Sequence, residues 1–176
     1  AEFFYENVSI QSNVIHQAYL NEVKKLIFFG CSSMFPKFAP QPMKEDYLLS
    51  GYPEPTNEPF AIAKIAGLKM CESYNRQYGT DFISVIPTNI YGPNQNYDPM
   101  NSLVVPALIR KFHEAKKVSA KEVVIWGTGR PARDFLFSDD LADASIFLMK
   151  QSLGEDVFNI ASGRDYTIAD LAKIIK

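Results

Sequence analysis

The sequence predicts an α/β fold built on a parallel sheet, because helix-like and strand-like segments alternate along the chain. Two of the predicted strands are short apolar runs that end at Gly or Pro, at residues 24–30 (KKLIFFG) and 82–87 (FISVIP). Continuous apolar runs of this length are typical of strands buried on both faces of a sheet. A helix is predicted before the first of them, at 6–22, from its apolar residues at helical spacing.

The remaining elements continue this alternation. A helix is predicted over 58–79, with Pro59 in its first turn and Gly79 after its end. Ser138 and Thr167 each have the side chain of a helix N-cap, and Asp170 follows Thr167 at capping-box spacing. The other expected elements are a helix over 102–117, strands at 122–126, 135–137 and 157–160, and loops at 31–57 and 90–101.

Composition excludes several classes of function. The formal net charge is −2, and no five like charges follow one another, which argues against nucleic acid and anionic membranes as partners. No apolar run approaches the ~20 residues of a membrane span. Two cysteines, Cys31 and Cys71, are too few for a disulfide framework or a zinc site, and His16 and His113 are the only histidines. We therefore expect no metal centre and a reduced, cytoplasmic setting.

One feature of a dinucleotide-binding fold is missing. Such a fold carries a G-x-G-x-x-G turn after its first strand, where the backbone approaches the pyrophosphate. Gly127 and Gly129 form only a G-x-G pair, and the chain begins and ends on predicted helices. The sequence therefore predicts that the glycine-rich first half of the sheet lies upstream.

Five segments, in family order and spacing, resemble GDP-L-fucose synthases, which are extended short-chain dehydrogenases/reductases. They are residues 54–67 (EPTNEPFAIAKIAG), 71–79 (CESYNRQYG), 87–93 (PTNIYGP), 106–115 (PALIRKFHEA) and 126–129 (WGTG). The resemblance implies the second half of a Rossmann-type doubly wound parallel sheet with part of a small substrate-binding region. It also implies the family's reaction, in which GDP-4-keto-6-deoxymannose is epimerised at two carbons and its ketone is then reduced with NADPH.

The resemblance further implies how the chain is divided. We expect one partial domain over 1–176, in which 1–88 form the C-terminal half of the Rossmann core. Residues 89–134 are expected to be mainly substrate-binding segments, and 135–176 the remaining core and substrate-region elements. The implied ligands are NADP and a GDP-sugar, and the implied assembly is a homodimer.

The positions that carry the family's chemistry have changed. Hydride delivery to a ketone creates an alkoxide that an acid must protonate. The family uses a tyrosine, and this chain has Phe60 there, although the partner lysine remains as Lys64. Cys31 stands where the family has the serine that binds the ketone. Ser33 and Leu103 stand where it has the cysteine and histidine of the epimerisation.

The binding positions are better kept. The resemblance implies contacts with the cofactor and with the GDP part of the substrate, where Lys111 replaces a phosphate-binding arginine. The implied cofactor-binding residues are Phe29, Gly30, Cys31, Ser32, Lys64, Pro87, Thr88, Asn89 and Ile90. The implied substrate-binding residues are Lys111, Trp126 and Arg133.

Three hypotheses follow for the function. The first is a GDP-L-fucose synthase-like enzyme that is impaired because its tyrosine is Phe60. The second is a non-catalytic pseudoenzyme that binds a nucleotide sugar or acts as a scaffold. The third is another nucleotide-sugar epimerase or dehydratase, which Phe60 disfavours because those enzymes need the same tyrosine. Trp126 as a boundary aromatic, and Arg133 as the surface ion-pair partner of Asp134, remain the alternatives to binding roles.

Overall fold

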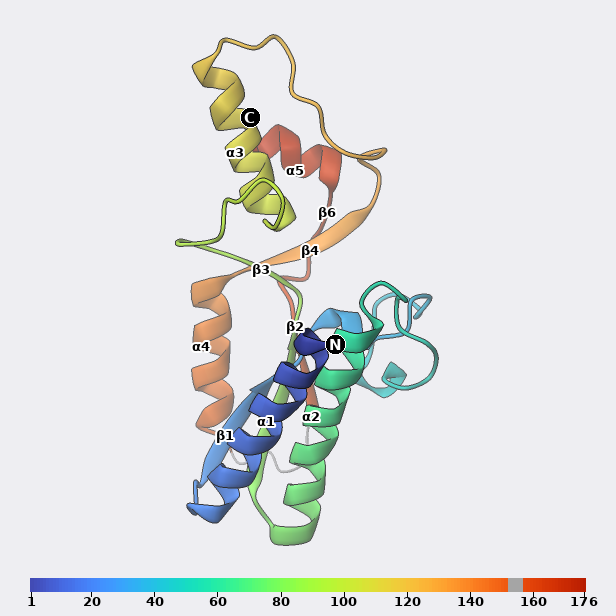
Figure 1. Cartoon of the computed structure of the whole chain (residues 1–176), viewed down its shortest axis with the longest axis vertical. Coiled ribbons are helices and arrows are strands. Elements are labelled where there is room, and N and C mark those ends of the chain that lie inside the picture. The colour runs from blue at the N-terminus through green and yellow to red at the C-terminus, as the bar shows by residue number, and fades with distance from the viewer. Residues whose placement is uncertain (152–156) are drawn as a thin grey trace. The chain divides into compact units, whose positions relative to one another are not determined.

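A computed structural model describes residues 1–151 and 157–176 of the chain (Figure 1). Helices and strands alternate through most of this part, as predicted. The α-helices are α1 (Glu2–Leu20), α2 (Glu58–Tyr78), α3 (Val104–Lys117), α4 (Ser138–Met149) and α5 (Ile168–Ile175). The strands are β1 (Lys25–Phe29), β2 (Asp81–Pro87), β3 (Asn89–Tyr91), β4 (Ala132–Phe137), β5 (Val157–Ile160) and β6 (Asp165–Thr167). Short 3₁₀ turns, η1 (Ser32–Met34) and η2 (Glu45–Tyr47), interrupt the loop predicted over 31–57.

The chain forms two compact units. The first unit contains Ala1–Thr88 and Ala142–Ile160, and the second contains Asn89–Leu141 and Ala161–Lys176. Each unit has its own sheet and its own apolar core.

The first unit is built on a parallel sheet with the strand order β1-β2-β5. Leu26 lies opposite Phe82 on the neighbouring strand, and Val85 lies opposite Phe158. The strands predicted at 24–30, 82–87 and 157–160 are therefore confirmed to within one residue at each end. Their continuous apolar character has the predicted cause, since the central strand β2 is buried from Phe82 to Pro87.

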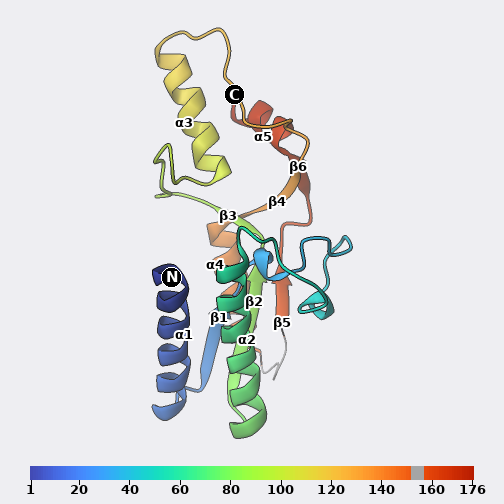
Figure 2. The same cartoon turned by 45° about the vertical axis from the view of Figure 1, so that its right-hand side comes forward.

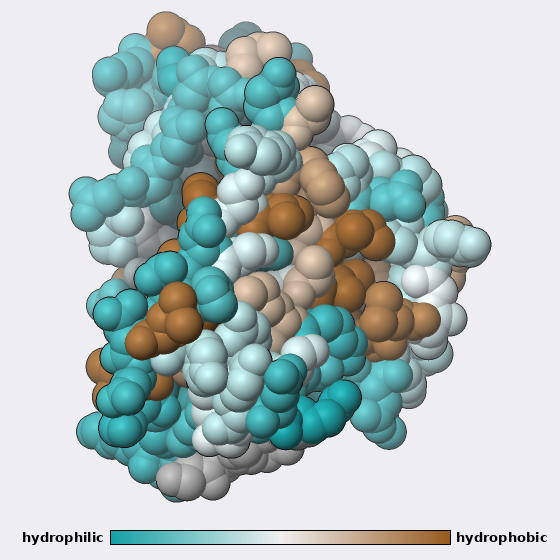
Figure 3. Space-filling model, turned by 60° about the horizontal axis from the view of Figure 1, so that its bottom comes forward, coloured by the Kyte–Doolittle hydropathy of each residue, from teal (hydrophilic) through white to brown (hydrophobic). Residues whose placement is uncertain are grey.

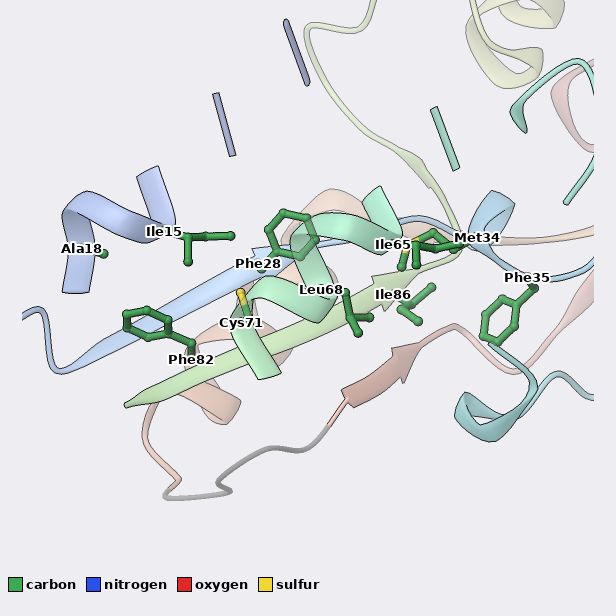
Figure 4. Packing of buried hydrophobic residues seen from close by; sticks show 10 residues of the cluster. All are labelled: Ile15, Ala18, Phe28, Met34, Phe35, Ile65, Leu68, Cys71, Phe82 and Ile86. Carbon is green, nitrogen blue, oxygen red and sulfur yellow. The ribbon is translucent and has the colours of Figure 1, made fainter. Parts of the chain in front are cut away.

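Helices cover both faces of this sheet. On one face α1 and α2 lie side by side along the strands (Figures 1 and 2). The side chains of Ile15, Phe28 and Leu68 fill the space between these helices and the sheet (Figure 4). On the other face Ile83 belongs to a separate apolar cluster with Leu148 of α4. Successive side chains along a strand point to opposite faces of the sheet, so each strand contributes to both clusters. A parallel sheet with helices on both faces confirms the predicted doubly wound α/β class.

Gly67 sets the distance between α1 and the sheet. A Cβ added to Gly67 would lie 2.7 Å from Cε2 of Phe28 and 2.9 Å from Cδ of Gln11. Gln11, buried on α1, also donates a hydrogen bond to the carbonyl oxygen of Ala63. Only a residue without a side chain lets α1, α2 and β1 approach so closely.

The second unit has a small mixed sheet with the order β3-β4-β6. Strand β3 pairs parallel with β4, and β4 pairs antiparallel with β6. Helices α3 and α5 pack together over it through the buried residues Val105, Leu108, Phe135, Leu171 and Ala172. The N-cap predicted at Thr167 is confirmed, because its hydroxyl accepts a hydrogen bond from the backbone N–H of Asp170 at 3.0 Å.

Three expectations were wrong. Residues 122–126 do not form a strand: Val124 is 70% exposed, and its carbonyl accepts a hydrogen bond from the Nζ of Lys111 instead of a neighbouring strand. An apolar run needs a paired edge to become a strand. Strand β3 overlaps the start of the loop predicted at 90–101, and β6 was not predicted. Both have only three residues, too few to establish a periodicity.

Within the part of the chain that the structure describes, no helix is both long enough and apolar enough to cross a membrane.

Candidate functional site

The predicted site residues of the first unit gather where its parallel strands end. β1 ends at Phe29 and β2 at Pro87, at the same edge of the sheet, which is where open α/β sheets bind ligands. The N–H of Gly30 donates to the carbonyl of Val85 at 2.8 Å. A Cβ at Gly30 would lie 2.7 Å from Sδ of Met34, so a larger residue at this point would have to displace the Met34 side chain. The N–H of Thr88 donates to Ile160 at 3.0 Å, which joins the edge to β5.

Lys64 reaches this edge from α2. Its ammonium donates a hydrogen bond to the carbonyl of Phe29 at 3.0 Å. The same Nζ lies 5.1 Å from the ring centroid of Phe28 and 5.8 Å from that of Phe60. Aromatic faces at these distances attract a cation. Three groups thus orient one positive charge at the carboxyl end of β1.

Phe60 lies one helical turn before Lys64, so the two side chains share a face of α2, as the sequence predicted. The Phe60 ring is half-buried and packs against Phe3 of α1, with their centroids 5.4 Å apart. A phenyl ring has no proton to donate. The arrangement can therefore hold a cationic side chain but supplies no acid at this position.

The turn that follows β1 brings two polar side chains together. Sγ of Cys31 and Oγ of Ser33 are 2.8 Å apart, and either can be the donor. Both residues are half-buried. Ser32 begins the 3₁₀ turn, and the buried side chains of Met34 and Phe35 anchor its far end in the core. This turn packs against α2, the helix that carries Phe60 and Lys64.

The second unit holds the other predicted site residues. Asn89 and Ile90 lie in β3, where Nδ2 of Asn89 donates to the carbonyl of Asp134 at 3.0 Å. Leu103 is the N-cap residue of α3 and is 65% exposed. Its apolar side chain cannot take part in proton transfer.

Lys111 and Trp126 form a pair within this unit. Nζ of Lys111 lies 4.6 Å from the indole centroid and donates to the carbonyl of Val124 at 3.3 Å. Trp126 is nevertheless 80% exposed, so its other face is open to solvent. Arg133 is exposed on β4 and donates to the neighbouring carbonyl of Ala132 at 2.7 Å. The unit thus offers two cationic side chains and an exposed aromatic face.

Sequence reasoning missed three contributors to these arrangements. Phe28 and Phe3 support Lys64 and Phe60, but in the sequence they are simply apolar residues of a strand and a helix. Asp134 orders the turn after β5 by accepting hydrogen bonds from Ser162 and from the N–H of Arg164, at 3.0 Å. No local sequence signal joins residues that lie 28 and 30 positions apart.

Cys71 takes no part in the site. It is a buried residue of α2, and burial raises the pKa of its thiol to about 12, with the hydrogen bond to Ser84 acting in the opposite direction. Its neutral side chain serves packing. Among the described residues no three His, Cys, Asp or Glu side chains come together in a group that could hold a metal ion.

Comparison with known proteins agrees with this geometry. A GDP-L-fucose synthase of Arabidopsis thaliana is 56% identical over all 176 residues, which cover 54% of that protein. The structure of a GDP-L-fucose synthetase from Naegleria fowleri bound to NADP matches 99% of this chain with a TM-score of 0.93 at 30% identity, over 54% of its own length. A GDP-mannoheptose C4 reductase from Campylobacter jejuni with NADP bound matches the whole chain with a TM-score of 0.88 at 41% identity, over 63% of its length.

The chain spans about half the length of the curated relatives it matches. The model of the NAD dependent epimerase/dehydratase family matches residues 1–161, which are nearly all of it. The parallel sheet β1-β2-β5, the edge at the end of β1 and the α2 lysine all lie within the matched residues, and the chain belongs to the NAD dependent epimerase/dehydratase family.

Proposed function

We propose that the native protein that carries this sequence is a GDP-L-fucose synthase-like protein of nucleotide-sugar metabolism whose catalysis is impaired. The observation that carries this proposal is the Phe60–Lys64 pair: the lysine is held at the end of β1, but the residue beside it has no acidic proton. High identity to GDP-L-fucose synthases over the whole chain supports the substrate class.

The reduction is the step that Phe60 affects. When bound, NADPH supplies a hydride to the ketone, and the resulting alkoxide needs a proton from a positioned group. Phe60 cannot provide it, and Lys64 already donates to the carbonyl of Phe29. Loss of a general acid typically slows a reaction by about 10²–10⁴-fold.

The epimerisation is affected independently. Moving a proton at a carbon beside a carbonyl requires a base on one face and an acid on the other. Ser33 has a hydroxyl, which is a far poorer base than a thiolate, and Leu103 has no titratable group. We therefore expect epimerisation to remain weak even if the reduction is restored.

Binding is the better-kept part of the function. Lys64 fits the role of holding the cofactor's ribose, because its charge is already oriented by Phe29, Phe28 and Phe60. In the second unit, Lys111 and Arg133 supply positive charge for a diphosphate, and the open face of Trp126 suits a guanine base. The non-catalytic alternative, a pseudoenzyme that binds GDP-sugars, rests on the same groups.

A homodimer is part of the proposal. Helix α1 exposes Phe3, Ile10 and Val14, which recur at helical spacing along one face, and Ile62 is exposed on the neighbouring α2. Figure 3 shows apolar side chains gathered on one face of the molecule. Exposed apolar surface of this kind marks an interface. Sedimentation of the native protein and of an Ile10→Lys variant tests this: the substitution should yield monomers.

The decisive experiment follows NADPH consumption by the native protein on GDP-4-keto-6-deoxymannose, with a Phe60→Tyr variant in parallel. We expect the variant to consume NADPH faster, because it regains the acid beside Lys64, but by less than the ~10²–10⁴-fold of a full general acid, because the weak epimerisation still precedes the reduction. Turnover by the unaltered protein at the variant's rate would contradict impaired catalysis. If neither protein turns over but both bind GDP-sugars, the pseudoenzyme alternative holds.

A further inference from the structure

The turn after β1 carries a thiol and a hydroxyl in direct contact, next to the helix that carries Phe60 and Lys64. We infer that the hydroxyl of Ser33 is the hydrogen-bond donor to the substrate's ketone oxygen and that the thiol of Cys31 is the positioning group that holds it. This inference rests on the function proposed above. It deepens that function by assigning the ketone contact to a residue that replaces an epimerisation group.

The geometry limits where the Ser33 hydroxyl can be. Oγ of Ser33 lies 2.8 Å from Sγ of Cys31, so the hydroxyl is directly beside the side chain at position 31. The backbone on both sides is tied down. The N–H of Gly30 bonds to Val85 at 2.8 Å, and the N–H of Met34 bonds to the carbonyl of Cys31 at 3.1 Å. A fixed backbone keeps the two side chains in contact.

The direction of the hydrogen bonds follows from donor strength. A hydroxyl is a good donor and acceptor, whereas a thiol is weak in both roles. When a ketone oxygen is present, the Ser33 O–H gains most by pointing to it. The Cys31 S–H then donates to the oxygen of Ser33. In the opposite arrangement the weak donor, the Cys31 S–H, would bond to the ketone, and the Ser33 O–H would bond to the weakly accepting sulfur.

Other groups beside the ketone are poorer candidates. The ring of Phe60 has no donor, and the ammonium of Lys64 is turned to the carbonyl of Phe29. The pair Cys31–Ser33 thus retains one serine and one cysteine, with their positions exchanged along the turn. The exchange preserves the ketone's hydrogen bond but moves the sulfur away from the place where a base for epimerisation would stand.

The test is an infrared measurement on the native protein with GDP-4-keto-6-deoxymannose labelled with ¹³C at C4. A hydrogen bond to the ketone lowers its C=O stretching frequency. We expect Ser33→Ala to return the frequency to the value of the unbonded ketone and Ser33→Thr to keep it lowered. Cys31→Ala should keep the lowered frequency but broaden the band, because the hydroxyl is no longer held. Ser73→Ala, at an exposed serine bonded to Lys69 of its own helix, is the matched control.

Affinity provides a second readout. Loss of one hydrogen bond should weaken binding of the keto sugar to Ser33→Ala by about 2- to 10-fold and leave binding of GDP unchanged. The inference is overturned if Ser33→Ala keeps the lowered frequency, or if Cys31→Ala alone loses it. If the unaltered protein does not bind GDP, the proposed function itself fails, and the assignment of Ser33 fails with it.

Discussion

Replacement of Gly67 by alanine tests the packing that brings α1, α2 and β1 together. The new Cβ would lie 2.7 Å from Cε2 of Phe28 and 2.9 Å from Cδ of Gln11, well inside the ~3.5–4.0 Å of an optimal carbon contact. Both neighbours are buried, so neither can swing out into solvent. The clash must therefore be relieved by moving a helix or the Phe28 ring.

Two opposing effects determine how much Gly67→Ala changes the free energy of unfolding: overpacking of the core and a better helix propensity. Overpacking a well-packed core costs about 1–3 kcal/mol, and so close a contact with a ring belongs near the upper end. Replacing glycine by alanine inside a helix returns about 1 kcal/mol. We therefore expect Gly67→Ala to lower the free energy of unfolding by about 2 kcal/mol, or Tm by about 4–8 °C.

Thermal unfolding of the native protein, followed by circular dichroism, measures this change. Ala66→Gly, at the exposed neighbouring position of α2, is the control for helix propensity alone and should cost about 1 kcal/mol. Adding Phe28→Leu to Gly67→Ala should recover part of the loss, because the smaller side chain makes room for the methyl group. An unchanged or higher Tm for Gly67→Ala would refute the close approach of α1 to Phe28.

Two further predictions concern single side chains. Because burial raises the pKa of Cys71 to about 12 from 9.0, the unfolded thiol ionises first as the pH rises. The free energy of unfolding should thus fall between about pH 9 and 12, and it should fall less in Cys71→Ala. Chemical denaturation at several pH values measures this, and the same dependence of the unfolding free energy on pH in both proteins would contradict the prediction. Trp126 is the single tryptophan of the sequence, and Lys111 covers one of its faces. Lys111→Ala should increase quenching of its fluorescence by acrylamide, and unchanged quenching would argue against the stacked pair.

Much of the fold could be read from local pattern. Local patterns predicted the helix around Lys64 and the strands at 24–30, 82–87 and 157–160. Each of these elements buries a continuous or periodic apolar surface, and the residues that form it follow one another within a short segment. The run at 122–126 has similar composition but is not a strand. A segment of this kind forms a strand only when the edge of another strand is available for pairing. A local sequence pattern does not reveal whether such an edge is present.

The site divides in the same way. The sequence by itself determined which chemical groups are present: a phenylalanine without a proton at position 60, a lysine one turn later, and a serine and a cysteine exchanged in one turn. Only the tertiary structure decided that the rings of Phe28 and Phe60 flank the Lys64 ammonium, and that Sγ of Cys31 meets Oγ of Ser33. Residue types are carried by the chain, but hydrogen bonds and cation–π contacts depend on distances of a few ångströms. Those distances are set when distant segments pack around a common core.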